Sequence, residues 1–249
     1  MDRLPLIAGN WKMYKTIPEA LALIKALLPH LPKDREVAVA PPFTALYAVA
    51  SCIKGTTLKL AAQNVFWEKE GAYTGEISPL MLKDIGCEYV IIGHSERRQY
   101  FGEVDKTVAK KVNSVLEEGL KPILCVGERL EEREKGETFE IVKKQLMGGL
   151  GNIQEIQKIV IAYEPVWAIG TGKTASSAQA QEVHKYLRHL VEEKWGREDS
   201  EKIRILYGGS VKPENIDKLM QEKDIDGVLV GGASLKAETF VKIMNYGVT

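Results

Sequence analysis

The sequence predicts an α/β protein built as a single (β/α)8 barrel, and three observations support this fold class. Eight short apolar runs recur along the chain, amphipathic helical patterns lie between them, and the length of 249 residues is close to that of one such barrel. An open, doubly wound sheet uses the same strand-plus-helix units of roughly 30 residues, but eight nearly equal units favour closure. No Pro/Gly/Ser-rich linker interrupts the chain, so we expect one catalytic domain over residues 1–249.

Each apolar run has the length of a short buried strand. The runs show no clear alternation of polar and apolar residues, which is typical of parallel strands that are covered on both faces. In chain order, the predicted strands are Leu4–Ala8, Val37–Ala40, Leu58–Ala62, Tyr89–Ile92, Pro122–Val126, Ile159–Tyr163, Ile203–Tyr207 and Gly227–Val230.

Helical spacing of apolar residues marks three of the intervening helices clearly. The first covers Pro18–Leu28, and Thr16 and Glu19 have the spacing of a capping box at its start. The second covers Asp105–Glu118 and the third covers Ser177–Trp195. These patterns alternate with the predicted strands, as the barrel requires.

Composition and charge exclude several classes of protein. Lys plus Arg and Asp plus Glu both number 34, so no basic surplus favours a nucleic acid or an anionic membrane as a partner. No apolar stretch approaches the length of a membrane span or of a secretory signal. The histidines form no metal motif, and the cysteines are scattered without a CxxC pair. We therefore expect no metal, a cytoplasmic location, and reduced thiols at Cys52, Cys87 and Cys125.

Polar residues and glycines gather where the predicted strands end. In a (β/α)8 barrel the active site lies at the carboxyl ends of the strands, so these positions carry the functional information. They are Asn10-Trp11-Lys12, Gln63-Asn64, Gly93-His94-Ser95-Glu96, Gly127-Glu128, Glu164-Pro165, Gly208-Gly209-Ser210 and Gly231-Gly232.

Glu164 directly follows the predicted sixth strand and is a candidate general base, because a carboxylate there can take a proton from a carbon next to a carbonyl. Taken alone, a solvated surface glutamate is the simpler interpretation. The next segment, Pro165–Ala175, has a glycine-containing tip between stiffer ends, as expected for a lid, although a plain exposed loop is the alternative. The segment ends like a phosphate-binding P-loop, but Trp167 occupies the position where that motif requires its first glycine.

His94 and Lys12 lie at two other strand ends. A histidine that enters a helix after a strand can polarise a carbonyl, and backbone amides at the helix start favour its neutral form. A lysine beside the first strand can hold a phosphate and stabilise a developing oxyanion. A satisfied structural histidine and a solvated lysine are the alternatives for each residue on its own.

Two glycine-rich turns, Gly208-Gly209-Ser210 and Gly231-Gly232, follow the seventh and eighth strands. Barrel enzymes often bind phosphate at these two positions through backbone N–H groups and a short helix N-terminus. Glycine lets the backbone approach an anion closely. Either turn alone is weak evidence, but both together predict a phosphate site.

The segments AGNWK, GHSERR, AYEPVWAIGTGKTA, YGGSV and VGGASL resemble the triosephosphate isomerase family, in order and over the whole chain. The resemblance implies a TIM barrel that interconverts dihydroxyacetone phosphate and D-glyceraldehyde 3-phosphate through an enediolate, in glycolysis and gluconeogenesis. It implies Glu164 as the base, neutral His94 as the group that polarises the carbonyl, and Lys12 as the cation that stabilises the enediolate. It implies no cofactor and no metal.

The resemblance also implies substrate-binding and supporting residues. Asn10 would help to place the substrate oxygens, and Glu96 and Cys125 would support the site. Lid closure would exclude water and limit loss of phosphate from the intermediate. Backbone groups would hold the phosphate at Gly170, Ser210, Gly231 and Gly232.

The stretch Gln63–Ser78 is long for a strand-to-helix connection and carries three aromatic residues that are costly to leave in water. In the family this loop docks into a second subunit, so the resemblance implies a homodimer with Thr74 beside the partner's catalytic lysine. A lid folded over its own barrel is the alternative.

Two other functions remain open from the residues alone. A Schiff-base aldolase on the same fold would need a shielded lysine at an inner strand end, and Lys12 is the candidate. A non-catalytic binder of phosphorylated ligands would bind without turnover, but it has no need for Glu164, His94 and Lys12 together. The glycine-dense segment Gly148–Asn152 has no functional explanation in the sequence.

Overall fold

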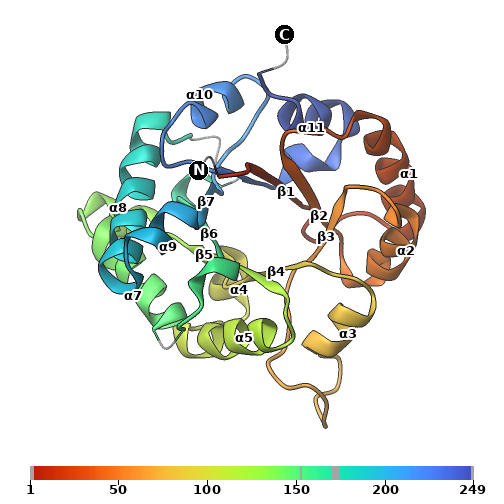
Figure 1. Cartoon of the computed structure of the whole chain (residues 1–249), viewed down its shortest axis with the longest axis horizontal. Coiled ribbons are helices and arrows are strands. Elements are labelled where there is room, and N and C mark those ends of the chain that lie inside the picture. Colours follow the sequence, from red (N-terminus) through yellow and green to blue (C-terminus); the bar gives the residue numbers. More distant parts are fainter. Residues whose placement is uncertain (1–2, 152, 170–173, 248–249) are drawn as a thin grey trace.

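The strands form a closed barrel with helices around it (Figure 1). The computed structural model describes residues 3–151, 153–169 and 174–247. Each strand pairs in parallel with the next along the chain, and β1 closes the barrel by pairing with β8, where Gly9 lies opposite Val230. The predicted fold class is therefore confirmed.

The strand bounds differ from the predicted ones by only one or two residues. They are β1 Leu6–Asn10, β2 Glu36–Ala40, β3 Lys59–Ala62, β4 Tyr89–Ile92, β5 Lys121–Val126, β6 Val160–Tyr163, β7 Arg204–Tyr207 and β8 Gly227–Val230. The largest correction is at β1, which was predicted to begin at Leu4. Leu4 is exposed, and Pro5 has no N–H for a strand ladder, so the first ladder residue is Leu6, whose amide donates to the Asp226 carbonyl at 3.0 Å.

The predicted helices are present with similar small shifts. The predicted capping box is present, because the Thr16 amide and hydroxyl both donate to the Glu19 carboxylate. The α-helices are α1 Ile17–Leu27, α2 Phe43–Ile53, α3 Pro79–Asp84, α4 Ser95–Tyr100, α5 Asp105–Glu117, α6 Leu130–Glu134, α7 Thr138–Leu150, α8 Ser177–Trp195, α9 Arg197–Lys202, α10 Ile216–Met220 and α11 Ala237–Met244. Short 3₁₀ turns cover Leu28–His30 (η1), Ile156–Lys158 (η2), Val166–Ala168 (η3) and Gly232–Leu235 (η4).

Alternate residues of each strand face two different cores. In β1, Leu6 and Ala8 belong to a small cluster inside the barrel, whereas Ile7 belongs to the larger cluster that packs under the helices. The strands are therefore apolar on both sides, which explains why their sequences show no alternation. Packing on both faces holds the strand ends in place, and those ends carry the site.

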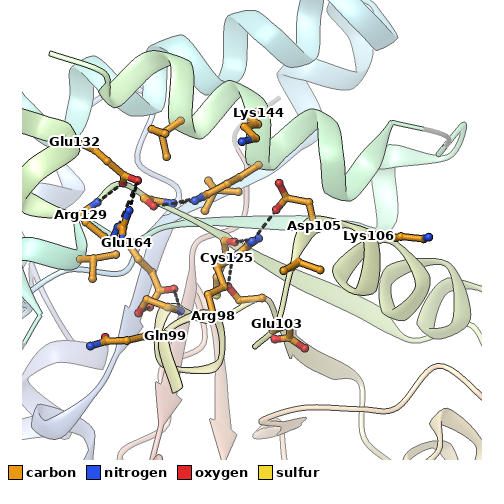
Figure 2. A pocket seen from close by; sticks show the side chains of 18 residues that line it. Arg98, Gln99, Glu103, Asp105, Lys106, Cys125, Arg129, Glu132, Lys144 and Glu164 are labelled. Atoms are coloured by element: carbon orange, nitrogen blue, oxygen red, sulfur yellow. Dashed lines mark hydrogen bonds and ion pairs between the residues drawn. The ribbon is translucent and has the colours of Figure 1, made fainter. Parts of the chain in front are cut away.

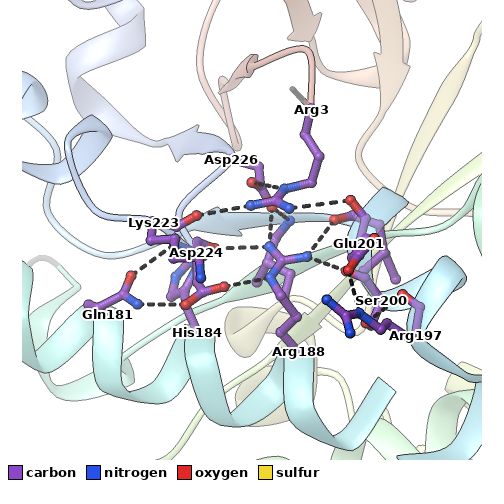
Figure 3. Close-up of polar contacts among 12 residues, drawn as sticks. Arg3, Gln181, His184, Arg188, Arg197, Ser200, Glu201, Lys223, Asp224 and Asp226 are labelled. Atoms are coloured by element: carbon purple, nitrogen blue, oxygen red, sulfur yellow. Dashed lines mark hydrogen bonds and ion pairs between the residues drawn. The ribbon is translucent and has the colours of Figure 1, made fainter. Parts of the chain in front are cut away.

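A network of ion pairs joins the residues just before β8 to α8 and to the start of the chain (Figure 3). Arg188 of α8 pairs with Asp224 at 2.7 Å and with Asp226 at 2.5 Å, and Arg3 also pairs with Asp226. Next to it lies His184, fully buried, with Nδ1 3.2 Å from the Asp224 carbonyl oxygen. Burial lowers the pKa of His184 to about 3, although the Asp224 carbonyl acts in the opposite direction.

None of the helices formed by the described residues combines the length and apolar character needed to span a bilayer.

The buried His184 makes stability depend on pH. Its pKa is about 3 in the folded protein and 6.5 ordinarily, so between these values only the unfolded chain takes up the proton. This residue therefore lowers the free energy of unfolding by about 1.4 kcal/mol for each unit that the pH falls below 6.5. Urea unfolding of the wild type and of His184→Gln at fixed protein concentration, between pH 5 and pH 8, measures the effect.

We expect a flatter pH dependence for His184→Gln, even though the variant is less stable at neutral pH. His189→Gln is the matched control, because His189 is an exposed residue of the same helix. Equal slopes for the wild type and His184→Gln would contradict the assignment.

Candidate active site

The predicted site residues that the structure describes line one cavity of about 360 Å³ at the carboxyl ends of the strands. Asn10 is the last residue of β1, so it lies in the strand and not after it. The others come from the connections that follow β1, β4, β6, β7 and β8. Gly170, the remaining predicted phosphate ligand, lies outside the described residues. The cavity is lined by Asn10, Lys12, His94, Glu164, Gly208, Gly209, Ser210, Gly231 and Gly232, among others.

Glu164 directly follows β6, and its side chain is buried, with 2% of its surface exposed. The Ser95 amide donates to Oε2 at 2.9 Å, the Ser95 hydroxyl lies 3.3 Å from Oε1, and Nε2 of His94 lies 2.9 Å from Oε1. Burial is the largest single effect and raises the pKa of Glu164, but the contacts with His94 and the Ser95 amide, together with the charge of Lys12, outweigh it, so its pKa lies below the usual value. Glu164 is therefore an ionised base that Ser95 and His94 hold in place.

His94 occupies the N-cap position of α4, directly after the left-handed residue Gly93. The Glu96 amide donates to Nδ1 at 3.2 Å, so Nδ1 is an acceptor and Nε2 carries the proton that faces Glu164. Burial is the largest single effect and lowers the pKa of His94, but the charge and hydrogen bond of Glu164, together with the charge of Glu96, outweigh it, so the pKa lies above the ordinary value while these contacts persist. The state of His94 therefore depends on where the carboxylate of Glu164 lies.

Lys12 has a left-handed backbone, with φ of 52°, which is uncommon for a residue other than glycine. The Asn10 side chain accepts from its amide at 3.0 Å, and the Gln63 side chain donates to its carbonyl at 2.8 Å. The ammonium group pairs with Glu96 at 2.5 Å. These contacts compensate the strained backbone and hold the cation at the cavity.

The glycine turns leave room for the catalytic side chains. A Cβ added at Gly208 would lie 2.9 Å from Cγ of Glu164, and one added at Gly231 would lie 3.3 Å from Cε of Lys12. The 3₁₀ turn η4 begins at Gly232, so its free amides lie beside the cavity. The turns thus combine space for the base with donors for an anion.

The base of the predicted lid is anchored on Glu128, which is fully buried. Trp167 donates to Glu128 at 2.9 Å, the Tyr163 hydroxyl lies 3.1 Å from it, and Arg133 pairs with it at 3.2 Å. Burial, and then the charge of Glu128, raise the pKa of Tyr163, which stays a neutral donor. The segment 170–173 of the lid lies outside the described residues.

The structure brings in residues to which the sequence assigned no role, above all Ser95 and Glu128, and it shows that Gly208 of the predicted phosphate turn also leaves room for Glu164. Ser95 is the first residue of α4 after His94, and exposed amides at a helix start were the signal that could have identified it. Glu128 follows β5, but nothing in the sequence shows that it meets Trp167. Of the predicted supporting residues, Glu96 pairs with Lys12, and buried Cys125 lies next to Glu164, where burial and then that carboxylate raise the pKa of its thiol.

The fold and the site define a (β/α)8-barrel enzyme with a carboxylate, an imidazole and an ammonium group around a cavity that two glycine-rich turns also line. The model of the triosephosphate isomerase family matches residues 5–247. The chain is 58% identical to the triosephosphate isomerase of Trichlorobacter lovleyi over 248 residues, which cover 98% of this chain and 99% of that protein. It is 59% identical to that of Caldanaerobacter subterraneus subsp. tengcongensis, covering 98% of this chain and all of that protein. The chain therefore belongs to the triosephosphate isomerase family.

Burial lowers the pKa of His94 and Glu164 raises it, so this pKa reports on the contact between the two side chains. Removing the charge in Glu164→Gln leaves burial as the largest effect, so we expect the pKa of His94 to fall. Nitrogen-15 NMR titration of the ring nitrogens measures it, and exposed His189 in the same sample is the internal control. An unchanged titration midpoint for His94 would show that Glu164 does not set its charge.

Proposed function

We propose that the protein interconverts dihydroxyacetone phosphate and D-glyceraldehyde 3-phosphate, with Glu164, His94 and Lys12 as the catalytic groups and residues 1–249 as one catalytic barrel. One observation carries the proposal: the carboxylate, the imidazole and the ammonium group line the same cavity as the two glycine turns. Family membership supports this reaction, and the site supports these residue roles.

The reaction begins when Glu164 takes a proton from the carbon next to the substrate carbonyl. Nε2–H of His94 donates to the carbonyl oxygen, and together with the ammonium group of Lys12 it stabilises the negative charge of the enediolate that forms there. His94 gives its Nε2 proton to that oxygen and takes a proton back from the neighbouring hydroxyl, so that one proton passes between the two substrate oxygens. Return of the other proton from Glu164 to the neighbouring carbon completes the exchange of aldehyde and ketone. No electron leaves the substrate, so the reaction needs no redox cofactor. Lys12 and His94 act as the electrophilic groups, so the proposed mechanism needs no metal ion.

Glu164 must leave its hydrogen bonds with Ser95 before it can reach a substrate carbon. Those bonds lower its pKa, so breaking them makes the carboxylate a stronger base at the moment that it is needed. Gly208 leaves space beside Cγ of Glu164 for that movement. Substrate binding thus both positions and activates the base.

The phosphate would bind at the other side of the cavity, on backbone donors of Ser210, Gly231 and Gly232, with Gly170 from the lid. The volume of about 360 Å³ suits a three-carbon sugar phosphate. The Lys12 side chain lies close to Gly231, and its charge also acts on Glu164, so one cation can serve both the phosphate and the enediolate. Asn10 orients the Lys12 backbone and faces the same cavity.

A solvent-exchange experiment tests the reaction. The protein is incubated with dihydroxyacetone phosphate in D₂O, and we expect both aldehyde formation and deuterium incorporation at carbon. In Glu164→Asp the carboxylate is withdrawn by one methylene, so kcat falls by about 10²-fold while substrate binding persists. Absence of both signals for the wild type refutes the proposed function, and an undiminished kcat in the variant refutes the role of Glu164.

A Schiff-base aldolase reaction at the same site is disfavoured by the environment of Lys12. Its ammonium group pairs with the Glu96 carboxylate at 2.5 Å, whereas a Schiff-base lysine must present a free amine in a shielded pocket. No observation in the site favours this alternative. Borohydride treatment in the presence of substrate would trap a covalent adduct of an aldolase.

We also propose that the protein is a homodimer joined through the loop Gln63–Ser78, including Thr74. This loop connects β3 to α3 and reaches out beyond the ring of helices, and it does not fold over its own barrel (Figure 1). Its base is held by Lys111, which donates to Asn64 at 2.7 Å. Exposed apolar side chains support an interface, and they include Met13, Tyr14, Phe43, Tyr47, Tyr73, Leu80, Met81 and Phe101.

Sedimentation tests the dimer. We expect analytical ultracentrifugation at micromolar concentration to give twice the chain mass of 27.7 kDa. Replacing Thr74 and Tyr73, both exposed in the single chain, by arginine places charge in the interface and should yield monomers. A stable monomer of the wild-type protein would contradict the proposal.

A cytoplasmic location without nucleic-acid or membrane partners completes the proposal. The three cysteines are free thiols, as suits a reducing compartment, and equal numbers of acidic and basic residues give no strong surface charge for polyanions.

A further inference from the structure

The side chain of Arg98 folds back from α4 onto the turn that carries His94. Nε donates to the Gly93 carbonyl at 2.8 Å, and Nη2 lies 3.5 Å from the Cys125 carbonyl of β5. The guanidinium thus links the end of β4 to the neighbouring strand. Figure 2 shows this arrangement, with Arg98 between Cys125 and Asp105.

The turn needs such a link because the strand ladder ends just before it. The last paired residues of β4 and β5 are Ile92 and Leu124. Gly93 then takes a left-handed conformation with φ of 71°, and His94 and Ser95 follow. The guanidinium of Arg98 therefore holds the backbone at the point where strand hydrogen bonds stop.

Asp105, the first residue of α5, holds Arg98 from the other side, with Nη1 of Arg98 2.6 Å from its Oδ1. This carboxylate lies against α7 at Gly148, where an added Cβ would lie 2.7 Å from Cβ of Asp105. The glycine-dense segment Gly148–Asn152 begins within the last turn of α7, which ends at Leu150, and Asn152 lies outside the described residues. Gly148 thus makes room for Asp105.

We propose that Arg98, Asp105 and Gly148 are positioning residues that set where His94 and Ser95 meet Glu164; the proposal rests on the function proposed above. None of the three has a catalytic role of its own. They act through the Gly93 carbonyl, one residue from the imidazole and two from the amide that binds Glu164. A displacement near 1 Å at a reacting group costs about 10²-fold in rate, so a small movement of this turn has a large effect.

A second cavity makes the proposal testable by chemical rescue. It has a volume of about 670 Å³, and Arg98, Asp105, Ser95 and Glu164 all line it (Figure 2). Truncation of Arg98 would therefore leave a guanidinium-sized space that opens into this cavity. Free guanidinium can enter that space and restore the hydrogen bonds to Asp105 and to the two carbonyl oxygens.

The experiment measures kcat and KM for dihydroxyacetone phosphate in Arg98→Ala, with and without millimolar guanidinium chloride. We expect kcat per folded molecule to fall by about 10²-fold with a smaller change in KM, and guanidinium to restore part of kcat. Urea has a similar shape but no charge, and it should not restore activity. The wild type in guanidinium and Lys106→Ala, which removes an exposed cation at the same cavity, are the controls and should be unchanged.

Two further variants test the same proposal if Arg98→Ala does not fold. Arg98→Lys keeps the charge near Asp105 but cannot reach both carbonyl oxygens, so we expect it to fold and to lose kcat. Gly148→Ala should lose kcat even though alanine is the better helix former, so weakening of α7 cannot explain that loss.

Wild-type kcat in the folded variants, or a loss in Arg98→Ala that guanidinium does not restore, would overturn the inference. An inactive wild-type protein in the same assay would instead refute the proposed function, so the two failures are distinguishable.

Discussion

The contact between the Glu164 carboxylate and the start of α4 is the constraint around which the site is arranged. A buried carboxylate is unstable unless donors surround it, and here Ser95 and His94 supply them. The same donors orient the imidazole toward the base. Because burial and the donors act in opposite directions on the pKa of Glu164, a short movement of its side chain changes its strength as a base.

Parallel pairing of β4 and β6 on either side of β5 makes this contact possible, because it places the ends of both strands on one rim, and closure between β1 and β8 brings Lys12 next to the turn that follows β8. Apolar packing on both faces of the strands holds their ends, and short connections then set individual side chains. At the rim, backbone geometry is repeatedly unusual, as in left-handed Gly93 and Lys12. Polar contacts from Arg98 and Gln63 compensate for it. The strained backbone of Lys12 and the contacts that compensate for it therefore lie at the functional end, while the ion pairs around Arg188 join α8, the residues just before β8 and the start of the chain.

Local sequence patterns were enough to predict the architecture of the barrel. Continuous apolar runs predicted all eight strands to within two residues, because strands buried on both faces require apolar side chains at every position. The error at the start of β1 came from Leu4 and Pro5, which are apolar but exposed or unable to donate. Where a strand begins depends on hydrogen-bond partners elsewhere in the chain, and for β1 that partner is the Asp226 carbonyl. A local sequence pattern does not show which distant residue supplies the partner.

The sequence by itself determined the fold class and the chemical groups of the site, since strand ends, residue types and family motifs are all local. Only the tertiary structure decided how those groups act on each other. That Ser95 holds Glu164, that Glu128 anchors Trp167, and that Gly148 makes room for Asp105 are contacts between residues far apart in the chain. They arise from packing of separate elements against one another, and packing is a property of the closed barrel and not of any one segment.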